Sequence, residues 1–356
     1  MLDIDMNGKI AAESDISVSP PDHEERDGPA RVMTLPVKSV WRDGRLETSI
    51  YLPGSSIRGA LRNGASRAVA AARKARGAAM TPEHFLLVAK GGIKDRKSAG
   101  TDERLVDYLE NEKLRREEPL VSLFGAMERK IAGRWQIGDA VPIEPVTPNR
   151  KGRGVRSHPF QREPDLARFM DEAAYGAFLE RDAKRIEANV AEGQAEDLQR
   201  KIAAKKRRPE PDVAQIGQWE AEEKRLRATA STLSEEAGGM VNIQQVLGGW
   251  QAIPEGTTMR HRMRLRDVTD RELTVAFFAL RRLAREGRLG AHETRAEGYF
   301  RAAWDLRLSE DGGDFEPAGK LCIEDLGVRI ESDHPVLATA FQRSATILDE
   351  KPDDTA

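Results

Sequence analysis

The chain has 356 residues, of which 39% are hydrophobic and 33% charged. This length exceeds what one simple core usually fills, so it predicts two domains or one core with large insertions. The single cysteine, Cys322, excludes a disulfide framework and a cysteine-only metal site. We find no basic start with an apolar run, and no apolar stretch approaches ~18 residues, so we expect a soluble, cytoplasmic protein without membrane contact.

The charges are segregated along the chain. The 57 Lys and Arg nearly balance the 59 Asp and Glu, and a net charge of −2 taken alone argues against a nucleic-acid binder. However, residues 54–76 and residues 146–162 carry several basic residues and no acid. Such segregation favours a binding site for a polyanion, and the alternative is that these basic segments are simply solvated.

The first ~50 residues are predicted to be β structure. Residues 32–37 and 46–52 have the pattern of two strands, and Asp43-Gly44 between them favours a hairpin turn. Pro53-Gly54 ends the second strand. Ser55 or Ser56 is expected to cap a helix that runs to about Ala72.

The middle of the chain alternates between helical and irregular segments. Residues 81–118 are predicted to be helical and charged, residues 120–125 form an apolar stop, and residues 135–143 form a strand. Residues 144–164 are rich in proline and basic residues and predict an irregular, mobile arm. Residues 165–236 predict an antiparallel helical hairpin with its turn at Arg208–Pro211.

The last third returns to mixed structure. Strands are predicted over residues 241–247, 257–268 and 299–308, and Thr269 with Glu272 forms a capping box for a helix ending at Gly287. Without its inserts the chain reads β-α-β-β-α-β, which predicts an α+β fold with a ferredoxin-like, RNA-recognition-motif core. The expected organisation is a palm core over 1–80 and 238–345, a helical and β insertion over 81–143, a thumb-like arm over 144–164, a helical hairpin insertion over 165–237 and an acidic tail over 346–356.

Motifs for catalysis are missing from the sequence. The Gly54–Ala60 segment has the glycine spacing of a phosphate loop but Ala60 in place of the lysine, and the six histidines form no pair at metal-ligand spacing. The sequence also lacks a nucleophile elbow, and Cys322 has no activating neighbour. We therefore predict a protein that is not an enzyme and has no cofactor and no metal.

Two patterns predict binding of a polyanion. Arginine occupies every second position from 260 to 266, so on a strand four guanidinium groups share one face; the alternative is that acidic insert helices neutralise them. At the strand–helix junction, the free N–H groups of the helix start, with Arg58 and Arg62 one turn apart, can hold a phosphate. An ordinary serine cap is the competing interpretation of that junction.

Three segments resemble motifs of one known family. Residues 51–62, YLPGSSIRGALR, resemble the Pro-Gly-Ser-Ser segment of the RAMP superfamily (repeat-associated mysterious proteins) of CRISPR systems. Leu123-Phe124-Gly125 is similar to the short LFG segment of that family, and residues 287–300 are similar to its C-terminal glycine-rich loop. The three segments occur in the family's order. Together with the long helical insertion, the pattern is most similar to the backbone subunit of type IV effector complexes.

The resemblance implies a non-catalytic subunit that oligomerises along a guide RNA as a helical filament. It implies four kinds of partner: the guide RNA, target nucleic acid held by base pairing, copies of the subunit, and other effector-complex subunits. It suggests that the subunit binds guide phosphates and leaves the bases free for pairing. The RNA-binding residues expected from the patterns and the resemblance are Gly54, Ser55, Ser56, Arg58, Arg62, Arg150, Lys151, Arg153, Arg156, Arg260, Arg262, Arg264, Arg266, His292 and Arg295.

Two other functions remain open. RNA-cutting members of the family carry an aspartate shortly before the Pro-Gly-Ser-Ser segment, and here Asp27 lies farther upstream than that pattern requires. An endoribonuclease that cuts guide precursor or target RNA, using Asp27 or His292, is therefore the alternative. A scaffold that binds only protein is a third interpretation, and it leaves the alternating arginines unexplained.

Overall fold

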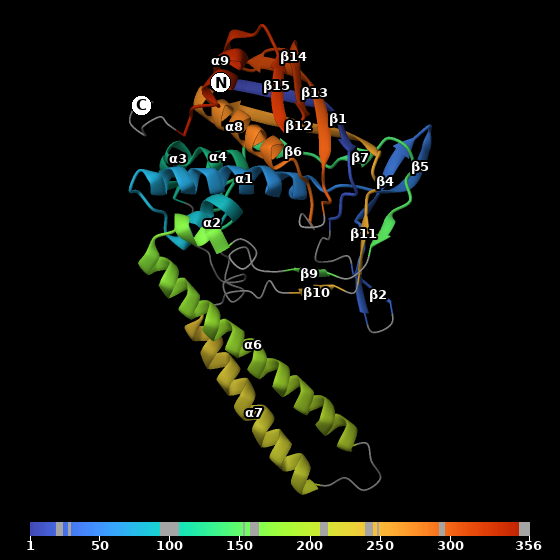
Figure 1. Ribbon diagram of the computed structural model, residues 1–356, viewed down its shortest axis with the longest axis vertical. Coiled ribbons are helices and arrows are strands. Elements are labelled where there is room, and N and C mark those ends of the chain that lie inside the picture. Colours follow the sequence, from blue (N-terminus) through green and yellow to red (C-terminus); the bar gives the residue numbers. More distant parts are fainter. Residues whose placement is uncertain are drawn as a thin grey trace. The chain divides into compact units, whose positions relative to one another are not determined.

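The computed structural model describes residues 1–18, 24–27, 30–92, 107–151, 154–156, 164–206, 213–238, 245–247, 249–291 and 296–348 (Figure 1). Its Cα positions divide into two compact units. One unit comprises residues 1–93, 105–156 and 245–356, and the other comprises residues 94–104 and 157–244. None of the described helices is long and apolar enough to cross a membrane.

A large antiparallel sheet forms the core of the first unit. Its strand order is β15-β14-β13-β1-β12-β6, and β7 also pairs with β12. Alternating apolar residues on β1, such as Ile4, Met6 and Ile10, are fully buried and meet Met263 and Leu265 of β12. The strands are β1 (Leu2–Ala12), β6 (Trp135–Ile137), β7 (Val141–Pro142), β12 (Thr258–Val268), β13 (Phe300–Glu310), β14 (Glu316–Glu324) and β15 (Gly327–Glu331).

Helices pack together beside this sheet and cover its apolar face. Helix α8 (Asp270–Glu286) starts at the predicted capping box of Thr269 and Glu272, and it contacts α1, α9, β12 and β15. The other helices of this unit are α1 (Gly54–Ala75), α2 (Pro82–Lys90), α3 (Tyr108–Glu117), α4 (Pro119–Phe124) and α9 (Pro335–Arg343). The opposite side of β1, β12 and β13 carries mostly exposed polar residues, and we call this side the open face.

The fold class is confirmed as mixed α and β with an antiparallel sheet and helical insertions. The core elements run β1, α1, β6, β12, α8, β13, which reads β-α-β-β-α-β. From the sequence, residues 46–52 and 241–247 were expected to be the first and second strands of this series, and both expectations are wrong. The first core strand is β1, because residues 46–50 pair with 37–42 in the β-hairpin β4 (Val37–Arg42) and β5 (Arg45–Ile50). The second is β6, because residues 245–247 pair with residues 154–156 instead.

Part of the predicted irregular arm is β structure. Strand β8 (Asn149–Lys151) joins a second sheet of order β2-β3-β11-β8, and β9 (Gly154–Arg156) pairs with β10 (Gln245–Leu247). The other strands of this second sheet are β2 (Glu24–Asp27), β3 (Ala30–Met33) and β11 (Gly249–Ala252). The expectation of an irregular arm over residues 144–164 is therefore wrong for residues 149–151 and 154–156.

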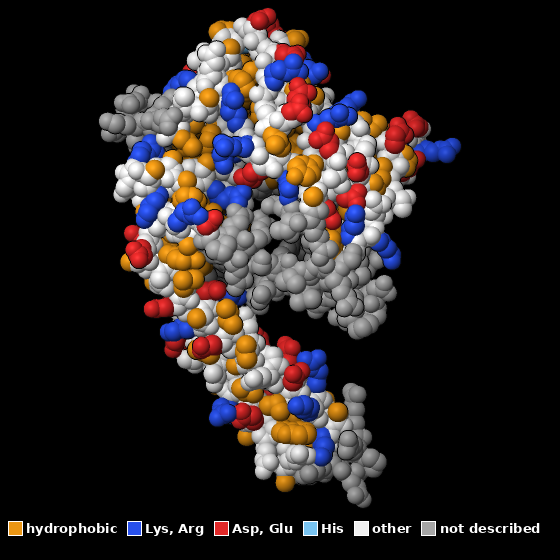
Figure 2. Space-filling model, viewed as in Figure 1, with side chains coloured by type: hydrophobic (Ala, Val, Ile, Leu, Met, Phe, Trp, Pro, Cys, Tyr) orange, Lys and Arg blue, Asp and Glu red, His pale blue; other side chains and the backbone are white. Residues whose placement is uncertain are grey.

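The second unit contains the helical insert, α6 (Glu172–Lys206) and α7 (Val213–Glu236), preceded by a 3-10 turn at Pro164–Phe169. Lys184 pairs with Glu236 and Lys206 pairs with Glu220, so the two helices run antiparallel as predicted. The predicted turn at residues 208–211 lies outside the described residues. On the visible surface of the insert, Lys and Arg side chains are interspersed with Asp and Glu, and hydrophobic side chains are exposed between them (Figure 2).

Candidate nucleic-acid interface

The four arginines of β12 lie on the open face of the sheet. The burial pattern of Thr258–Val268 alternates, with Met259, His261, Met263 and Leu265 buried and Arg260, Arg262 and Arg266 exposed. This confirms the predicted placement of the four guanidinium groups on one side of the strand. It follows that the face opposite the helices is lined by arginine.

Two of these arginines are balanced by carboxylates of β1. Arg262 Nε donates to Asp5 Oδ1 at 2.7 Å, and an Arg264 terminal nitrogen donates to Asp3 Oδ2 at 2.6 Å. Burial alone would raise the pKa of Asp3, but hydrogen bonds from Arg264 and from the Asp267 N–H lower it below its usual range. These carboxylates belong to β1 and not, as considered from the sequence, to the insert helices.

The other two arginines of β12 have no such balance. Among the described residues, Arg260 and Arg266 make no ion pair within 4.0 Å, and both side chains are exposed. Lys9 of β1 is the direct cross-strand neighbour of Arg260, and it is exposed as well. Like charges placed directly opposite each other destabilise a sheet, so this part of the open face is suited to an anion. Lys9 was not predicted as a binding residue from the sequence, although the alternation of Leu2, Ile4, Met6 and Ile10 is the signal that reveals β1.

The start of helix α1 differs from the predicted phosphate site. The residue at the N-cap is Pro53, with no side-chain cap, so the expected serine cap is wrong. The Gly54 N–H donates to Asp139 Oδ1 at 2.9 Å, and Lys38 Nζ donates to Asp139 Oδ2 at 2.7 Å. The protein's own carboxylate therefore occupies the position that was expected to receive a phosphate. Ser55 is exposed and Ser56 is partly exposed beside it.

Arg58 and Arg62 do not share an exposed face. Arg58 is exposed, but Arg62 is 7% exposed and donates to the carbonyl oxygens of Leu87 and Val88 at the end of α2. Burial, with a smaller contribution from Arg58, lowers the pKa of Arg62 to about 10. Arg62 was expected to lie on an exposed face of the helix beside Arg58. This is wrong, because α2 packs over the Arg62 side chain.

Arg62 connects two of the family-like segments. Its guanidinium lies 5.9 Å from the ring centroid of Phe124, the aromatic residue of the Leu-Phe-Gly segment. Gly125 follows with a positive φ of 79°, and an added Cβ there would lie 2.7 Å from the Ile131 carbonyl oxygen. These residues of the two motifs therefore shape the helix layer.

The glycine-rich loop is close-packed where it is described. The Ala291 N–H donates to the Ser17 carbonyl oxygen at 2.8 Å, and a Cβ on Gly290 would lie 2.3 Å from that same oxygen. Gly290 has a φ of 92°, so both its backbone conformation and its surroundings require glycine. The predicted contacts His292 and Arg295 lie outside the described residues.

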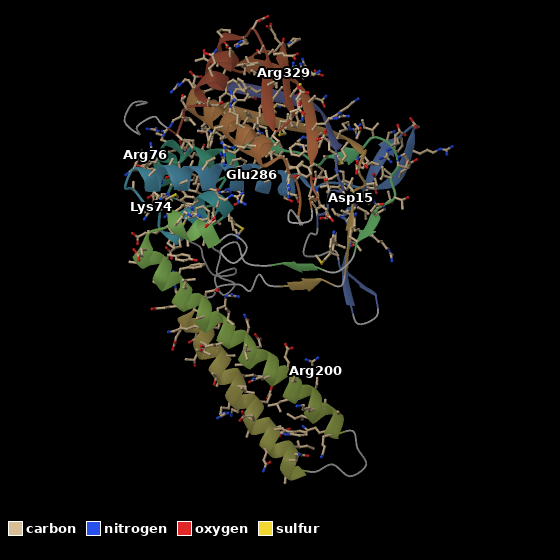
Figure 3. All side chains as sticks on the ribbon, viewed as in Figure 1. Asp15, Lys74, Arg76, Arg200, Glu286 and Arg329 are labelled. Carbon is tan, nitrogen blue, oxygen red and sulfur yellow. The ribbon has the colours of Figure 1, made fainter. Side chains whose placement is uncertain are left out.

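The basic residues predicted in the arm over 144–164 differ in their surroundings. Lys151 forms an ion pair with Asp15, whose hydrogen bond raises the pKa of Lys151 (Figure 3). Arg150 is exposed on β8. Arg153 lies outside the described residues, and Arg156 is described only as the last residue of β9.

The described residues contain no group of three or more side chains that could hold a metal ion. His261 is buried, and burial lowers its pKa to about 4. Asp27 is the last residue of β2, and its side chain lies outside the described part of the chain. The free thiol of Cys322 is buried.

A comparison with curated proteins found no match. Among solved structures, the chain is similar to a chain of a structure titled "Type IV-B CRISPR Complex", with 15% identity, a TM-score of 0.33, and coverage of 88% of this chain and 92% of that one. It is similar to Csc2 from Thermofilum pendens, with 10% identity, a TM-score of 0.36, and coverage of 97% and 77%. It is also similar to Cmr6 from Pyrococcus furiosus, with 16% identity, a TM-score of 0.34, and coverage of 83% and 97%.

The family assignment comes from the sequence. The family model described as the RAMP superfamily matches residues 43–301, which is most of the chain. The matched range includes all three motifs, the Pro-Gly-Ser-Ser segment, the Leu-Phe-Gly segment and the glycine-rich loop. This match confirms the resemblance that the three motifs carry. The chain belongs to the RAMP superfamily of CRISPR proteins.

Proposed function

We propose that this protein is a non-catalytic backbone subunit of a CRISPR ribonucleoprotein that oligomerises along the guide RNA. In this proposal the ferredoxin-like core is the palm that carries the RNA, and the open face supplies the cations that contact phosphates. The bases are left free to pair with the target nucleic acid. Its partners are the guide RNA, further copies of the chain and the other subunits of the complex.

The alternating arginines of β12 are the observation that carries the proposal. Four guanidinium groups on one exposed face are not needed for folding, and two of them make no ion pair among the described residues. Phosphates of a nucleic acid relieve the repulsion among these groups and release counterions on binding. Arg260 and Arg266 are the residues that we assign to this contact most directly.

Of the other residues predicted to bind RNA, some stay in the proposed interface and others are left out. Arg58, Ser55, Ser56 and Arg150 stay in the proposed interface because they are at least partly exposed. Arg62 is left out because its guanidinium binds the end of α2. Gly54 is left out as a phosphate donor because its N–H binds Asp139.

Purification from cells that express the guide RNA tests the proposal. We expect a large species that carries RNA of defined length and that shrinks after nuclease digestion in high salt, because phosphate contacts weaken as salt rises. A monodisperse, RNA-free monomer from those cells contradicts the proposal. Cleavage of the guide precursor or the target RNA that is lost in Asp27→Ala supports the endoribonuclease alternative instead.

A further inference from the structure

A groove opens between the β-hairpin and the open face of the sheet. Its volume is about 470 Å³, which is within the range of ligand-binding clefts. Its lining comes from five strands, which are far apart in sequence, and from the residue after β7. Its lining includes Lys9 of β1, Trp41 and Arg42 of β4, Pro142 of β7, Arg260 of β12 and Asp305 of β13.

The floor of the groove is basic. Lys9 and Arg260 lie directly opposite each other on β1 and β12, and neither makes an ion pair among the described residues. The next residue on the β13 side of Lys9 is Ala303, whose small side chain leaves the two cations uncovered. The only carboxylate among the lining residues is Asp305, which is exposed. The floor therefore offers two adjacent cations to an anionic group.

The β-hairpin that forms the wall is fixed in place. A terminal nitrogen of Arg42 donates to the Pro142 carbonyl oxygen at 2.6 Å and to Ser49 Oγ at 3.1 Å. Lys38 Nζ binds Asp139 at 2.7 Å, on the chain that leads into β7. Val40 of β4 is itself buried. These contacts hold the wall of the groove close to the strands of its floor.

An aromatic side chain lies at the edge of this wall. Trp41 is 68% exposed, and its cross-strand partner Leu46 is 66% exposed. Trp135, Trp250 and Trp304, in contrast, are at most 2% exposed. Exposed tryptophan next to basic residues is the combination that single-stranded nucleic-acid sites use, because bases stack on the ring while cations hold the phosphates.

We propose that this groove binds one nucleotide of single-stranded RNA, with its base stacked on Trp41 and its phosphate held by Lys9 and Arg260. The inference rests on the proposed function and adds a stacking position to the phosphate contacts. Stacking does not discriminate between bases, so the position accepts any guide sequence. A protein segment bound at the same apolar edge would contact both Trp41 and Leu46, and it would not need the adjacent cations of Lys9 and Arg260.

Matched variants test the proposal. We would measure binding of a guide-length single-stranded RNA to the full chain, using Trp41→Ala, Trp41→Phe and the control Leu46→Ala. Trp41→Ala is expected to weaken binding by roughly 5- to 100-fold without changing the salt dependence, whereas Trp41→Phe keeps most of the affinity. Leu46→Ala, with a side chain of nearly the same exposure on the same β-hairpin, is expected to bind as the unaltered chain does.

Two further readouts separate stacking from charge. RNA is expected to quench the tryptophan fluorescence of the unaltered chain, and the quenching is expected to be lost in Trp41→Phe. Lys9→Ala combined with Arg260→Ala is expected to lower the salt slope by about 0.7, since the two cations hold one phosphate and each single-strand phosphate contact contributes about 0.7. An abasic RNA of equal length is expected to bind the unaltered chain and Trp41→Ala equally.

The outcomes are distinguishable from failure of the proposed function. If the unaltered chain binds no RNA, both the proposed function and the stacking position are wrong. If the unaltered chain binds RNA and Trp41→Ala binds equally well, only the stacking position is wrong. Equal losses in Trp41→Ala and Leu46→Ala, together with a smaller assembly for both, also overturn it and identify the edge as a protein contact.

Discussion

Arg58 and Arg62 show how one turn of helix separates a surface charge from a structural one. Their spacing places them on neighbouring positions of α1, but α2 packs over Arg62 and leaves Arg58 exposed. The Arg62 guanidinium binds the carbonyl oxygens of Leu87 and Val88 in the last turn of α2, and the first of these also accepts from the Gly91 N–H at 2.9 Å. Arg62 is therefore a residue of the helix layer, although it belongs to the segment by which the family is identified.

This difference gives a prediction for single variants. Arg62→Ala is expected to lower the free energy of unfolding by about 1–3 kcal/mol, because the Val88 and Leu87 carbonyl oxygens lose the donors that the buried guanidinium supplies. Arg58→Ala is expected to change it by less than about 0.5 kcal/mol and to weaken RNA binding instead. Urea unfolding of both variants, with RNA binding measured in parallel, checks this. Equal stability of the two variants would contradict the structural assignment of Arg62.

His261 is a second residue whose role is set by burial. Trp304 Nε1 donates to His261 Nδ1 at 3.1 Å, and His261 Nε2 lies 3.1 Å from the Gly138 carbonyl oxygen. The neutral ring satisfies both contacts when Nε2 carries the proton. A second proton, on Nδ1, would meet the Trp304 N–H and have no acceptor. This buried position accounts for the lowered pKa of about 4.

The lowered pKa predicts how stability changes with pH. The unfolded chain takes up the His261 proton near pH 6.5 and the folded chain only near pH 4, so protonation favours unfolding between these values. Stability from this group is complete above about pH 6.5 and is lost as the pH falls toward 4, by on the order of 3 kcal/mol. Urea unfolding at pH 7 and pH 5 measures the loss. His261→Gln is expected to have a smaller difference between the two pH values, and an unchanged difference would contradict the prediction.

At the scale of elements, two glycines of helix α1 have opposite surroundings. A Cβ on Gly54 would lie 2.3 Å from the Ile137 carbonyl oxygen and 2.6 Å from that of Gly138, so the start of α1 is pressed against the chain after β6. A Cβ on Gly59 would meet no atom within 4 Å. The first glycine is required by close approach, and the second is not.

The two glycines form a matched pair of variants. Gly54→Ala is expected to destabilise the protein by more than about 3 kcal/mol, because backbone atoms must move apart. Gly59→Ala is expected to stabilise it by about 0.5–1 kcal/mol through higher helix propensity. Thermal unfolding of both variants checks the prediction. If Gly54→Ala melts at the temperature of the unaltered chain, the close contact with β6 is wrong.

Helices and strands could be predicted from the sequence where residues close together in the chain determine them. The alternation in β12, the capping box of α8 and the two helices of the insert could all be predicted from neighbouring residues. The start of α1 could not, because Asp139, which binds Gly54, lies 85 positions away in the chain. Strand β1 was missed although Leu2, Ile4 and Met6 alternate as a half-buried strand requires.

At the scale of the whole molecule, the net charge is near zero, but paired charges and unpaired cations lie on different elements. Along the helical insert, acids and bases pair within three or four positions, as in Arg200–Asp197 and Arg227–Glu223. On the open face, Lys9, Arg260 and Arg266 have no such partner among the described residues. Net charge is therefore a poor guide to nucleic-acid binding in this chain, and the position of unpaired cations is a better one.

In the proposed function, RNA phosphates contact the open face of the sheet through Arg260 and Arg266. We would measure binding of guide-length RNA over a salt series for Arg260→Ala with Arg266→Ala, and for a control pair, Arg200→Ala with Arg329→Ala (Figure 3). The control arginines are 74% and 59% exposed, and both pair with acids.

The β12 pair is expected to lose on the order of 1–3 kcal/mol of binding free energy, to the same extent for any guide sequence. Its salt slope is expected to fall by about 1.4. The control pair is expected to keep both the affinity and the slope. Equal losses in the two pairs would mean that general charge suffices, and this result would contradict the assignment of the interface to the open face.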